Sequence, residues 1–446
     1  MDLIEDNKFQ NAFLIYVSID LFYEKNKLEN DYDEFKSLVI SSGLEIKDCR
    51  NFNQKIPSIN TFITKGNLEN LKLQILDKDI DILIINHELN ASQTRNLEKY
   101  FNKRVIDKTE LILDIFASRA SSHIGKLQVE LAQLKHLSTR LIRGWTHLER
   151  QKGGIGLRGP GETQLETDRR LIGKRIKRLN ERLEKSHKQK EINRYSRKKS
   201  RNKLVALVGY TNAGKTTLFN KLTESSQLAE DKLFATLDSV TRKNKYPRYG
   251  PILFSDTVGF ISDLPTQLVE SFKATLDELT AADLLLHVVD IHDVDYRTKI
   301  QKVNNILCDI GVSNIPQIIV NNKCDLLDNS KIKQLKNRKQ NEVFLSAENG
   351  NKFEDLRSKI NMILFNGIYK GWISIEKNMG NVRSSLFDMG CVKEEKISQC
   401  GKMFVKIKIG NDELNELLDI KGFEVCHDED ILLKHYLIQK HYEQNK

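Results

Sequence analysis

Hydrophobic and polar residues alternate in different ways along the chain, and the changes divide it into four parts. In the first hundred residues, short apolar runs at 12–19 and 80–85 predict buried strands, and amphipathic stretches at 31–42 and 92–102 predict helices. Strands that alternate with helices favour a small α/β domain with a mostly parallel sheet. We expect this domain to occupy residues 1–109.

A longer period begins near residue 110. Apolar residues three, four or seven positions apart form one stripe that predicts a single long helix, and a second stripe follows in a basic segment: Leu113, Phe116, Ala120, Ile124, Leu127, Leu131, Leu134 and Leu141, then Leu165, Ile172, Ile176, Leu179 and Leu183. Residues 153–161 contain five Gly and one Pro, so no helix continues through them. We therefore predict an antiparallel helical hairpin with a glycine-rich tip at residues 110–201.

Strands and helices alternate again between residues 204 and 365, beginning with the apolar run 204–208. This pattern predicts a second, Rossmann-like α/β domain at residues 202–368. The remaining residues, 369–446, hold expected strands at 372–375 and 404–409 and an expected helix at 413–420. They predict a small α+β domain, so the whole chain is expected to be of the α/β class.

The composition indicates in which cellular compartment the protein resides. No apolar run in the 446 residues approaches the ~20 that a bilayer span needs, and the first six residues are acidic where a signal peptide would be basic. The six Cys include no CxxC pair, which argues against a disulfide framework or a zinc site. We expect a cytoplasmic monomer without stable membrane insertion.

The charge is concentrated in one segment. The formal net charge is +10, but residues 140–203 alone hold 21 Lys/Arg and 7 Asp/Glu, so the rest of the chain is mildly acidic. A charge run is often only a solvated helix face. A hairpin that carries the whole excess is also suited to the phosphates of RNA.

A phosphate-binding motif follows the run 204–208. The pattern GxxxxGK[ST] is formed by Gly209, Tyr210, Thr211, Asn212, Ala213, Gly214, Lys215 and Thr216. The glycines allow backbone N–H groups to surround a β-phosphate at a helix N-terminus. Lys215 supplies a positive charge to the β- and γ-phosphates, and the Thr216 hydroxyl can bind Mg²⁺.

Three shorter motifs follow, each after an expected strand: Asp256-Thr257-Val258-Gly259, Asn322-Lys323-Cys324-Asp325 and Ser346-Ala347-Glu348. Asp256 can hold the metal through water, and the Gly259 N–H can reach a γ-phosphate. Asp325 can accept both N1–H and the 2-amino group of guanine, which selects GTP over ATP. Backbone N–H groups at 346–348 can contact guanine O6. Four motifs at the carboxyl ends of strands predict a GTPase that uses Mg²⁺.

A switch segment between the phosphate loop and Asp256 should supply a Thr that senses the γ-phosphate and Mg²⁺. The spacing leaves two residues open: Thr241, and Thr236 within Phe234-Ala235-Thr236-Leu237-Asp238. Phe260 stands where related enzymes often use Gln to orient the attacking water, so we expect slow intrinsic hydrolysis that a partner completes. The Asn212 amide is placed to help bind a monovalent cation, which suggests K⁺ as a further cofactor.

Together these motifs resemble the HflX family of translational GTPases. The resemblance rests on GGIGLRGPGETQLE at 153–166, GYTNAGKTTLFN at 209–220, FATLD at 234–238, DTVGF at 256–260 and NKCD at 322–325, and it covers roughly residues 10–365. It implies a GTPase that binds the large ribosomal subunit and, when GTP is bound, splits stalled ribosomes. It also implies that the glycine-rich tip reaches ribosomal RNA.

The resemblance assigns roles to single residues. It implies that Thr236 binds Mg²⁺ together with Thr216, and that Asn322, Lys323, Asp325 and Ser346 recognise guanine. On this basis we expect Lys215, Thr236 and Gly259 to act in catalysis. The chain departs from the family at Ser239-Val240-Thr241, where Pro-Thr-Thr is frequent, and in its C-terminal domain, which varies.

Three alternatives stay open. The chain could be a GTPase that acts on precursors of the large subunit, or an RNA-binding scaffold in which GTP only adjusts affinity. A membrane-surface role for the hairpin is disfavoured, because no apolar face is left once its two stripes pair.

Overall fold

The structure is a computed structural model. It describes residues 10–19, 25–76, 78–144, 160–199, 203–225, 233–234, 240–243, 252–261, 279–328, 330, 332, 335, 341–350, 352–397, 402–420 and 422–426. The chain folds into two compact units. The first comprises residues 1–193, 230–238 and 258–277, and the second comprises 194–229, 239–257 and 278–446.

The first unit contains a four-stranded parallel sheet in the order β2-β1-β3-β4. Its elements are β1 (Asn11–Ile19), α1 (Lys25–Ser41), β2 (Glu45–Gln54), α2 (Lys65–Leu76), β3 (Ile82–Ile85), α3 (Ala91–Phe101) and β4 (Arg104–Asp107). The central strands β1 and β3 are apolar along their length because apolar clusters cover both faces of the sheet. The expected N-terminal α/β domain is therefore confirmed.

Three helices follow: α4 (Lys108–Arg119), α5 (His123–Gly144) and α6 (Pro160–Lys199). The prediction of one continuous helix through 113–141 is wrong, because the chain becomes extended at Ala120, where ψ is 110°. The Ser122 Oγ then accepts a hydrogen bond of 2.8 Å from the Gly125 N–H, which begins a new helix. As a result α4 packs into the core of the sheet through Phe116, and in the described part of the hairpin it is α5 that pairs with α6.

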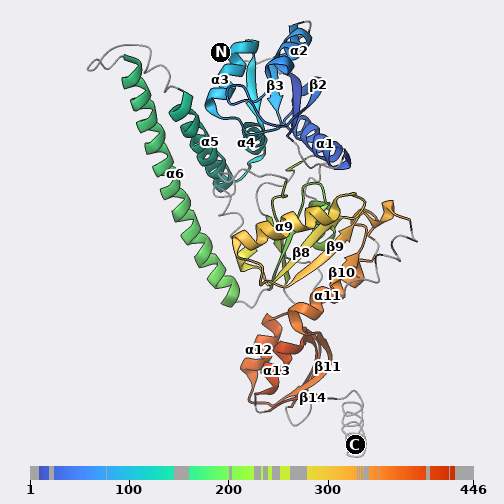
Figure 1. The fold of residues 1–446 in the computed structure, drawn as a ribbon. Helices are drawn as coiled ribbons and strands as arrows, with labels where there is room; N and C mark the ends of the chain where they lie inside the picture. The colour runs from blue at the N-terminus through green and yellow to red at the C-terminus, as the bar shows by residue number, and fades with distance from the viewer. Residues whose placement is uncertain are drawn as a thin grey trace, which may run out of the picture. The chain divides into compact units, whose positions relative to one another are not determined.

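Helices α5 and α6 lie side by side as the predicted hairpin (Figure 1). Their apolar stripes meet in one cluster formed by Leu127, Leu131, Leu179 and Leu183, flanked by Ile124, Leu134 and Ile176. The Arg175 Nε donates a hydrogen bond of 2.7 Å to Glu130 across the pair. Helix α6 begins at Pro160, which is favoured at a first helical position. The tip residues 151–159 and the side chains of Leu141 and Leu165 lie outside the described residues.

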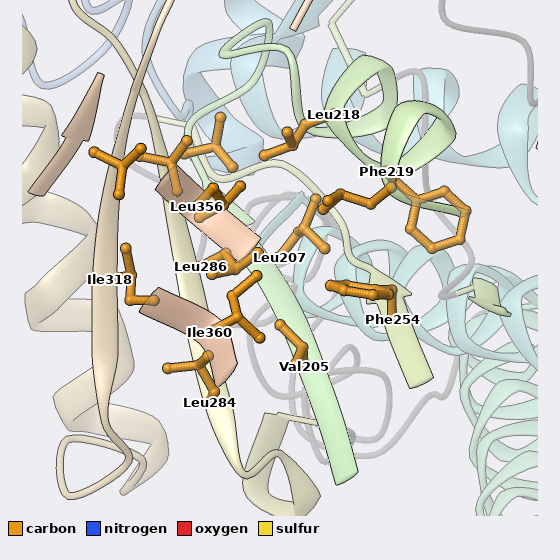
Figure 2. Packing of buried hydrophobic residues seen from close by; sticks show 14 of the residues in the cluster. Val205, Leu207, Leu218, Phe219, Phe254, Leu284, Leu286, Ile318, Leu356 and Ile360 are labelled. Atoms are coloured by element: carbon orange, nitrogen blue, oxygen red, sulfur yellow. The ribbon is translucent and has the colours of Figure 1, made fainter. Parts of the chain in front are cut away.

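The second unit contains a six-stranded sheet in the order β10-β9-β8-β5-β7-β6, parallel except for β6. Its elements are β5 (Lys203–Gly209), α7 (Lys215–Thr223), β6 (Val240–Lys243), β7 (Ile252–Asp256), β8 (Leu284–Asp290), α9 (Tyr296–Ile310), β9 (Gln317–Asn322), β10 (Glu342–Phe344) and α11 (Phe353–Phe365). Figure 2 shows the core in which Leu207, Leu286 and Ile318 of the sheet pack with Leu356 and Ile360 of α11. This arrangement confirms the expected Rossmann-like domain.

The same unit ends in a second, antiparallel sheet in the order β12-β13-β11-β14. Its elements are β11 (Ile368–Ile375), α12 (Gly380–Asp388), β12 (Val392–Ile397), β13 (Met403–Gly410), α13 (Asn411–Leu418) and β14 (Phe423–Cys426). Leu386 of α12 and Leu414 of α13 pack against Ile373, Val405 and Ile407, so both helices cover the same face of the sheet. The expected α+β domain is confirmed.

Across the residues that the structure describes, each helix is too short or too polar to cross a membrane.

Candidate nucleotide-binding site

The phosphate loop begins at the carboxyl end of the central strand β5 and requires glycine at two positions. Gly209 has a φ of +148°, and a Cβ there would lie 2.2 Å from the Val288 carbonyl oxygen. Gly214 has a φ of +86° and precedes α7, and its Cβ would lie 2.3 Å from Nδ2 of Asn322. A side chain at either position would clash with a neighbouring strand, so the loop keeps the close approach that a phosphate-binding backbone needs.

Lys215 lies inside this loop with almost no exposure to solvent. Its Nζ donates a hydrogen bond of 2.7 Å to the Tyr210 carbonyl oxygen. Burial lowers the pKa of the Lys215 ammonium to about 8, and the nearby Asp256 carboxylate opposes that shift. A bound phosphate would give this buried charge a counter-charge and hydrogen-bond acceptors.

Two oxygen ligands meet beside the loop. The Thr216 Oγ1 donates a hydrogen bond of 2.8 Å to Oδ2 of Asp256, which is fully buried at the end of β7. Thr257, the next residue, donates from Oγ1 to the Leu207 carbonyl oxygen at 2.6 Å and so fixes the end of β7 against β5. The Thr216 hydroxyl and the Asp256 carboxylate thus place two hard oxygen atoms side by side, and oxygen ligands of this kind fit Mg²⁺.

The guanine motifs are joined to the phosphate loop by one side chain. The Asn322 Nδ2 donates to the Ala213 carbonyl oxygen and its Oδ1 accepts from the Ala347 N–H, both at 2.9 Å. Lys323 adopts a φ of +60° and forms an ion pair of 2.7 Å with Asp290. Asp325 is exposed just beyond, where its carboxylate can meet a base.

The third motif forms a tight turn after β10. The Ser346 Oγ accepts from the Asn349 N–H at 3.3 Å, and the Ser346 carbonyl oxygen accepts from the Gly350 N–H at 3.0 Å. Ala347 is buried and Glu348 is exposed. The structure thus brings the residues predicted at 209–216, 256–257, 322–325 and 346–348 to the carboxyl ends of one sheet.

Not all of the predicted residues lie at this edge of the sheet, and some belong to the first unit. Phe234 is almost fully buried there, with its ring in an edge-to-face contact of 4.6 Å with Phe116. Val258 packs against the same apolar cluster, and Gly259 and Phe260 are buried. Four further predicted residues lie outside the described residues: Ala235, Thr236, Leu237 and Asp238. Cys324, which was also predicted, is buried in the second unit. Thr241 lies in β6.

Three residues near the site were not predicted. Asp290 ends β8 and holds Lys323, and Lys299 of α9 lies 4.8 Å from the centre of the Tyr210 ring. His287 on β8 is buried, and the Gln317 side-chain amide lies 2.7 Å from its Nδ1. An Asp at the end of an apolar strand was a usable signal for Asp290. Single residues such as Lys299 and His287 carry no spacing pattern.

Family models match most of the chain up to residue 323. The GTP-binding GTPase N-terminal model matches residues 29–117, the GTP-binding GTPase Middle Region model matches 119–197, and the 50S ribosome-binding GTPase model matches 204–323. Among solved structures, the chain is similar to a GTP-binding protein from Sulfolobus solfataricus in complex with GDP. That likeness has 26% identity, covers 80% of this chain and 99% of the other, and has a TM-score of 0.42.

Curated relatives match over a similar length. The chain is 43% identical over 395 residues to the GTPase HflX of Escherichia coli strain K12, covering 88% of this chain and 93% of the relative. It is 47% identical over 313 residues to the GTPase HflX of Alkalihalophilus pseudofirmus, covering 70% and 74%. Together with the nucleotide site at the end of the second unit's parallel sheet, these likenesses show that the chain belongs to the HflX family of GTPases.

Proposed function

We propose that this GTPase binds the large ribosomal subunit in its GTP state, dissociates stalled or stressed ribosomes, and is released when GTP is hydrolysed. The observation that carries the proposal is the guanine-nucleotide site, in which Asn322 links the phosphate loop to the turn at residues 346–350, which we call the guanine turn. The match of residues 204–323 to a 50S ribosome-binding GTPase model supports the ribosome as partner.

The site residues divide the chemistry among them. Thr216 and Thr236 would hold Mg²⁺, with Asp256 acting through water, and the metal would neutralise charge on the β- and γ-phosphates. Lys215 binds the same phosphates, and the Gly259 N–H meets the γ-phosphate. Phe260 has no hydrogen-bonding group and is buried. The attacking water therefore needs another group to orient it, and we propose that the ribosome completes the site.

The exposed face of α6 supports contact with ribosomal RNA. Among the side chains of α6 that the structure describes, nine Lys and Arg are exposed: Arg169, Arg170, Lys174, Arg175, Lys177, Arg178, Arg182, Lys185 and Lys188. Ile176, Leu179 and Leu183 of the helix pack against α5, so the basic side chains on the other faces are open to RNA phosphates. A glycine-rich tip would enter a narrow RNA cavity that larger side chains could not.

We also propose K⁺ as a cofactor of turnover. Asn212 is exposed within the phosphate loop at a φ of +59°, where its amide oxygen can bind a monovalent cation beside the phosphates. Exchange of potassium for sodium should lower the rate of GTP hydrolysis several-fold, measured as phosphate release in the presence of ribosomes. Asn212→Ala should remove the difference between the two ions. Equal rates in both salts for the unaltered chain contradict this assignment.

The splitting activity is tested on intact ribosomes in sucrose gradients. With GTP or a non-hydrolysable analogue, the 70S peak should decrease and the free subunits should increase, whereas GDP should leave the profile unchanged. Asp325→Asn is the matched control, because an Asn amide can donate to the 2-oxo group of xanthine, while the Asp carboxylate accepts from the 2-amino group of guanine. This variant should split ribosomes with xanthosine triphosphate and not with GTP.

Other outcomes identify the alternatives. Stable co-sedimentation with intact ribosomes and no subunit release supports an RNA-binding scaffold. Accumulation of precursor large subunits in a deletion strain, with no splitting in vitro, supports a role in assembly. Either result overturns the proposed splitting function and leaves the GTPase assignment intact.

A further inference from the structure

The C-terminal sheet has a second face that α12 and α13 do not cover. The chain order β11-α12-β12-β13-α13-β14 and the sheet order β12-β13-β11-β14 define a split β-α-β fold in which β11 and β13 are the central strands. The residues Ile373, Val405 and Ile407 of these strands point to the helices. Because side chains alternate along a strand, their neighbours at 372, 374, 404 and 406 share the opposite face.

Aromatic side chains lie on both central strands of this outer face. Trp372 of β11 is opposite Lys406, and Phe404 of β13 is opposite Ser374 in the antiparallel register. The RNA-recognition motif uses the same architecture, with aromatic side chains on the open face of a four-stranded sheet on which two or three bases stack. Phe404 is half-buried and open to a base, whereas Trp372 is only 5% exposed and lies beneath Lys396 and Lys406, so it becomes a second stacking platform when these lysines move.

Basic side chains surround these rings. The Lys396 and Lys406 ammonium groups lie 5.1 and 5.7 Å from the centre of the Trp372 ring. The face also carries Lys370, Lys402 and Lys408, and its acidic residues are Glu394 and Glu424 on the two edge strands. Positive charge therefore predominates at the centre of the face. This arrangement is complementary to a polyanion whose bases can stack.

A buried polar atom lies between the rings. Ser374 is 1% exposed, and its Oγ has no hydrogen-bond partner among the residues that the structure describes. Buried hydroxyls are normally paired, so this one has an unused hydrogen-bonding capacity that a ligand can meet once the side chains above it move. The hydroxyl can both donate and accept, as the edge of a base requires.

We propose that the outer face of the C-terminal sheet binds single-stranded RNA, with bases stacking on Trp372 and Phe404 and lysines contacting the phosphates. The lysines over Trp372 are exposed, and an exposed ammonium–ring contact is weaker than a stacked base, so Lys396 and Lys406 can move from the ring to the backbone of the RNA. The proposal goes beyond ribosome splitting. It concerns residues 368–426, which lie beyond the family-model matches.

The fluorescence of Trp372 can report binding of RNA to this face. The chain has two Trp, so Trp145→Phe in the full-length protein leaves Trp372 as the single fluorophore. We would titrate the GDP-bound protein with octauridylate and octaadenylate, and separately with a duplex of the same length, at physiological salt. Single strands should quench Trp372 emission. The duplex should not, because its bases are already stacked on one another.

Matched substitutions separate stacking from general charge. Phe404→Leu and Lys406→Gln should each weaken binding of the single strand about tenfold. Phe387→Leu and Lys377→Gln should leave it unchanged, since Phe387 is an exposed aromatic residue on α12 and Lys377 lies in the turn before that helix. Thermal unfolding of each variant checks that it is folded, and the exposed Lys406 keeps the test valid if Phe404→Leu is unstable.

Two results would overturn the proposal. One is unchanged Trp372 emission while the anisotropy of a labelled oligonucleotide shows that the RNA is bound elsewhere, as on α6. The other is equal affinity of the Lys406→Gln and Lys377→Gln variants for the single strand. Because the test uses short oligonucleotides and GDP, its failure leaves the ribosome proposal untouched, and failure of ribosome splitting leaves this proposal untouched.

Discussion

Asn322 shows how one side chain can fix a binding site. Its amide donates to the phosphate loop and accepts from the guanine turn, and both partners are backbone groups in the interior. The same amide occupies the space that a side chain at position 214 would need. Because Asn322 ends β9, this strand contributes to the requirement for glycine at position 214. A short side chain thus sets the distance between the two halves of the site before any nucleotide arrives.

His287 makes the stability of the second unit depend on pH. Burial lowers the pKa of its imidazole to about 4, and the Lys215 ammonium acts in the same direction. In the unfolded chain a His titrates near 6.5, so the unfolded state takes up the proton first. Stability is therefore complete above about pH 6.5 and is lost progressively as the pH falls toward 4.

We expect the free energy of unfolding to fall by roughly 3 kcal/mol between pH 6.5 and 4 from this residue alone. Urea unfolding followed across that range measures the change. His287→Leu should flatten the dependence, whereas His292→Gln, at an exposed position two residues beyond β8, should leave it as it was. Equal slopes for the unaltered chain and His287→Leu contradict the assignment.

At the scale of elements, the sequence predicted those whose side chains have a uniform environment. Strands β1 and β5 were predicted because nearly every residue in them is apolar and buried. Strand β2 was missed because it pairs only with β1 at the sheet edge and carries mostly polar residues, and β12 was missed for the same reason. An edge strand is held by backbone hydrogen bonds, which leave little trace in hydrophobicity.

The helix break between α4 and α5 shows another limit. The apolar spacing continues through it, because both helices bury one face, so periodicity alone joined them. The deciding feature is the local hydrogen bond from the Gly125 N–H to Ser122. The nucleotide motifs, in contrast, were placed correctly at strand ends, since Gly209, Gly214 and Asn322 each meet a backbone requirement that few other residues can.

On the scale of the whole molecule, the two units are interleaved in the sequence. Segments 230–238 and 258–277 lie within the sequence of the GTPase domain, yet they belong to the first unit. Leu233, Phe234 and Ile261 complete the apolar cluster that Phe116 and the N-terminal sheet begin, and the Leu233 N–H donates to the Ser41 Oγ at 3.1 Å. Phe234 was assigned from the sequence to the motif FATLD, and this core contact was not predicted, because an apolar residue does not reveal which core its side chain joins.

Phe234→Ala should therefore destabilise the first unit, by about 3–5 kcal/mol, since it leaves a cavity beside Phe116. Urea unfolding monitored by circular dichroism measures the loss. Phe387→Ala is the control, because that ring is 45% exposed and its removal should cost well under 1 kcal/mol. Equal effects of the two substitutions would show that Phe234 does not belong to this core.

The interleaving also determines when the first unit can finish folding during its own synthesis. Its core lacks Phe234 and Ile261 until these residues leave the ribosome, about 100 and 130 residues after Ala132, the last member contributed by the helices. At roughly 5–20 residues per second this delay lasts from several seconds to half a minute. Until Phe234 emerges, the apolar side chains that it later contacts have no partner at that place, so we expect the nascent N-terminal domain to expose apolar surface of the kind that chaperones bind.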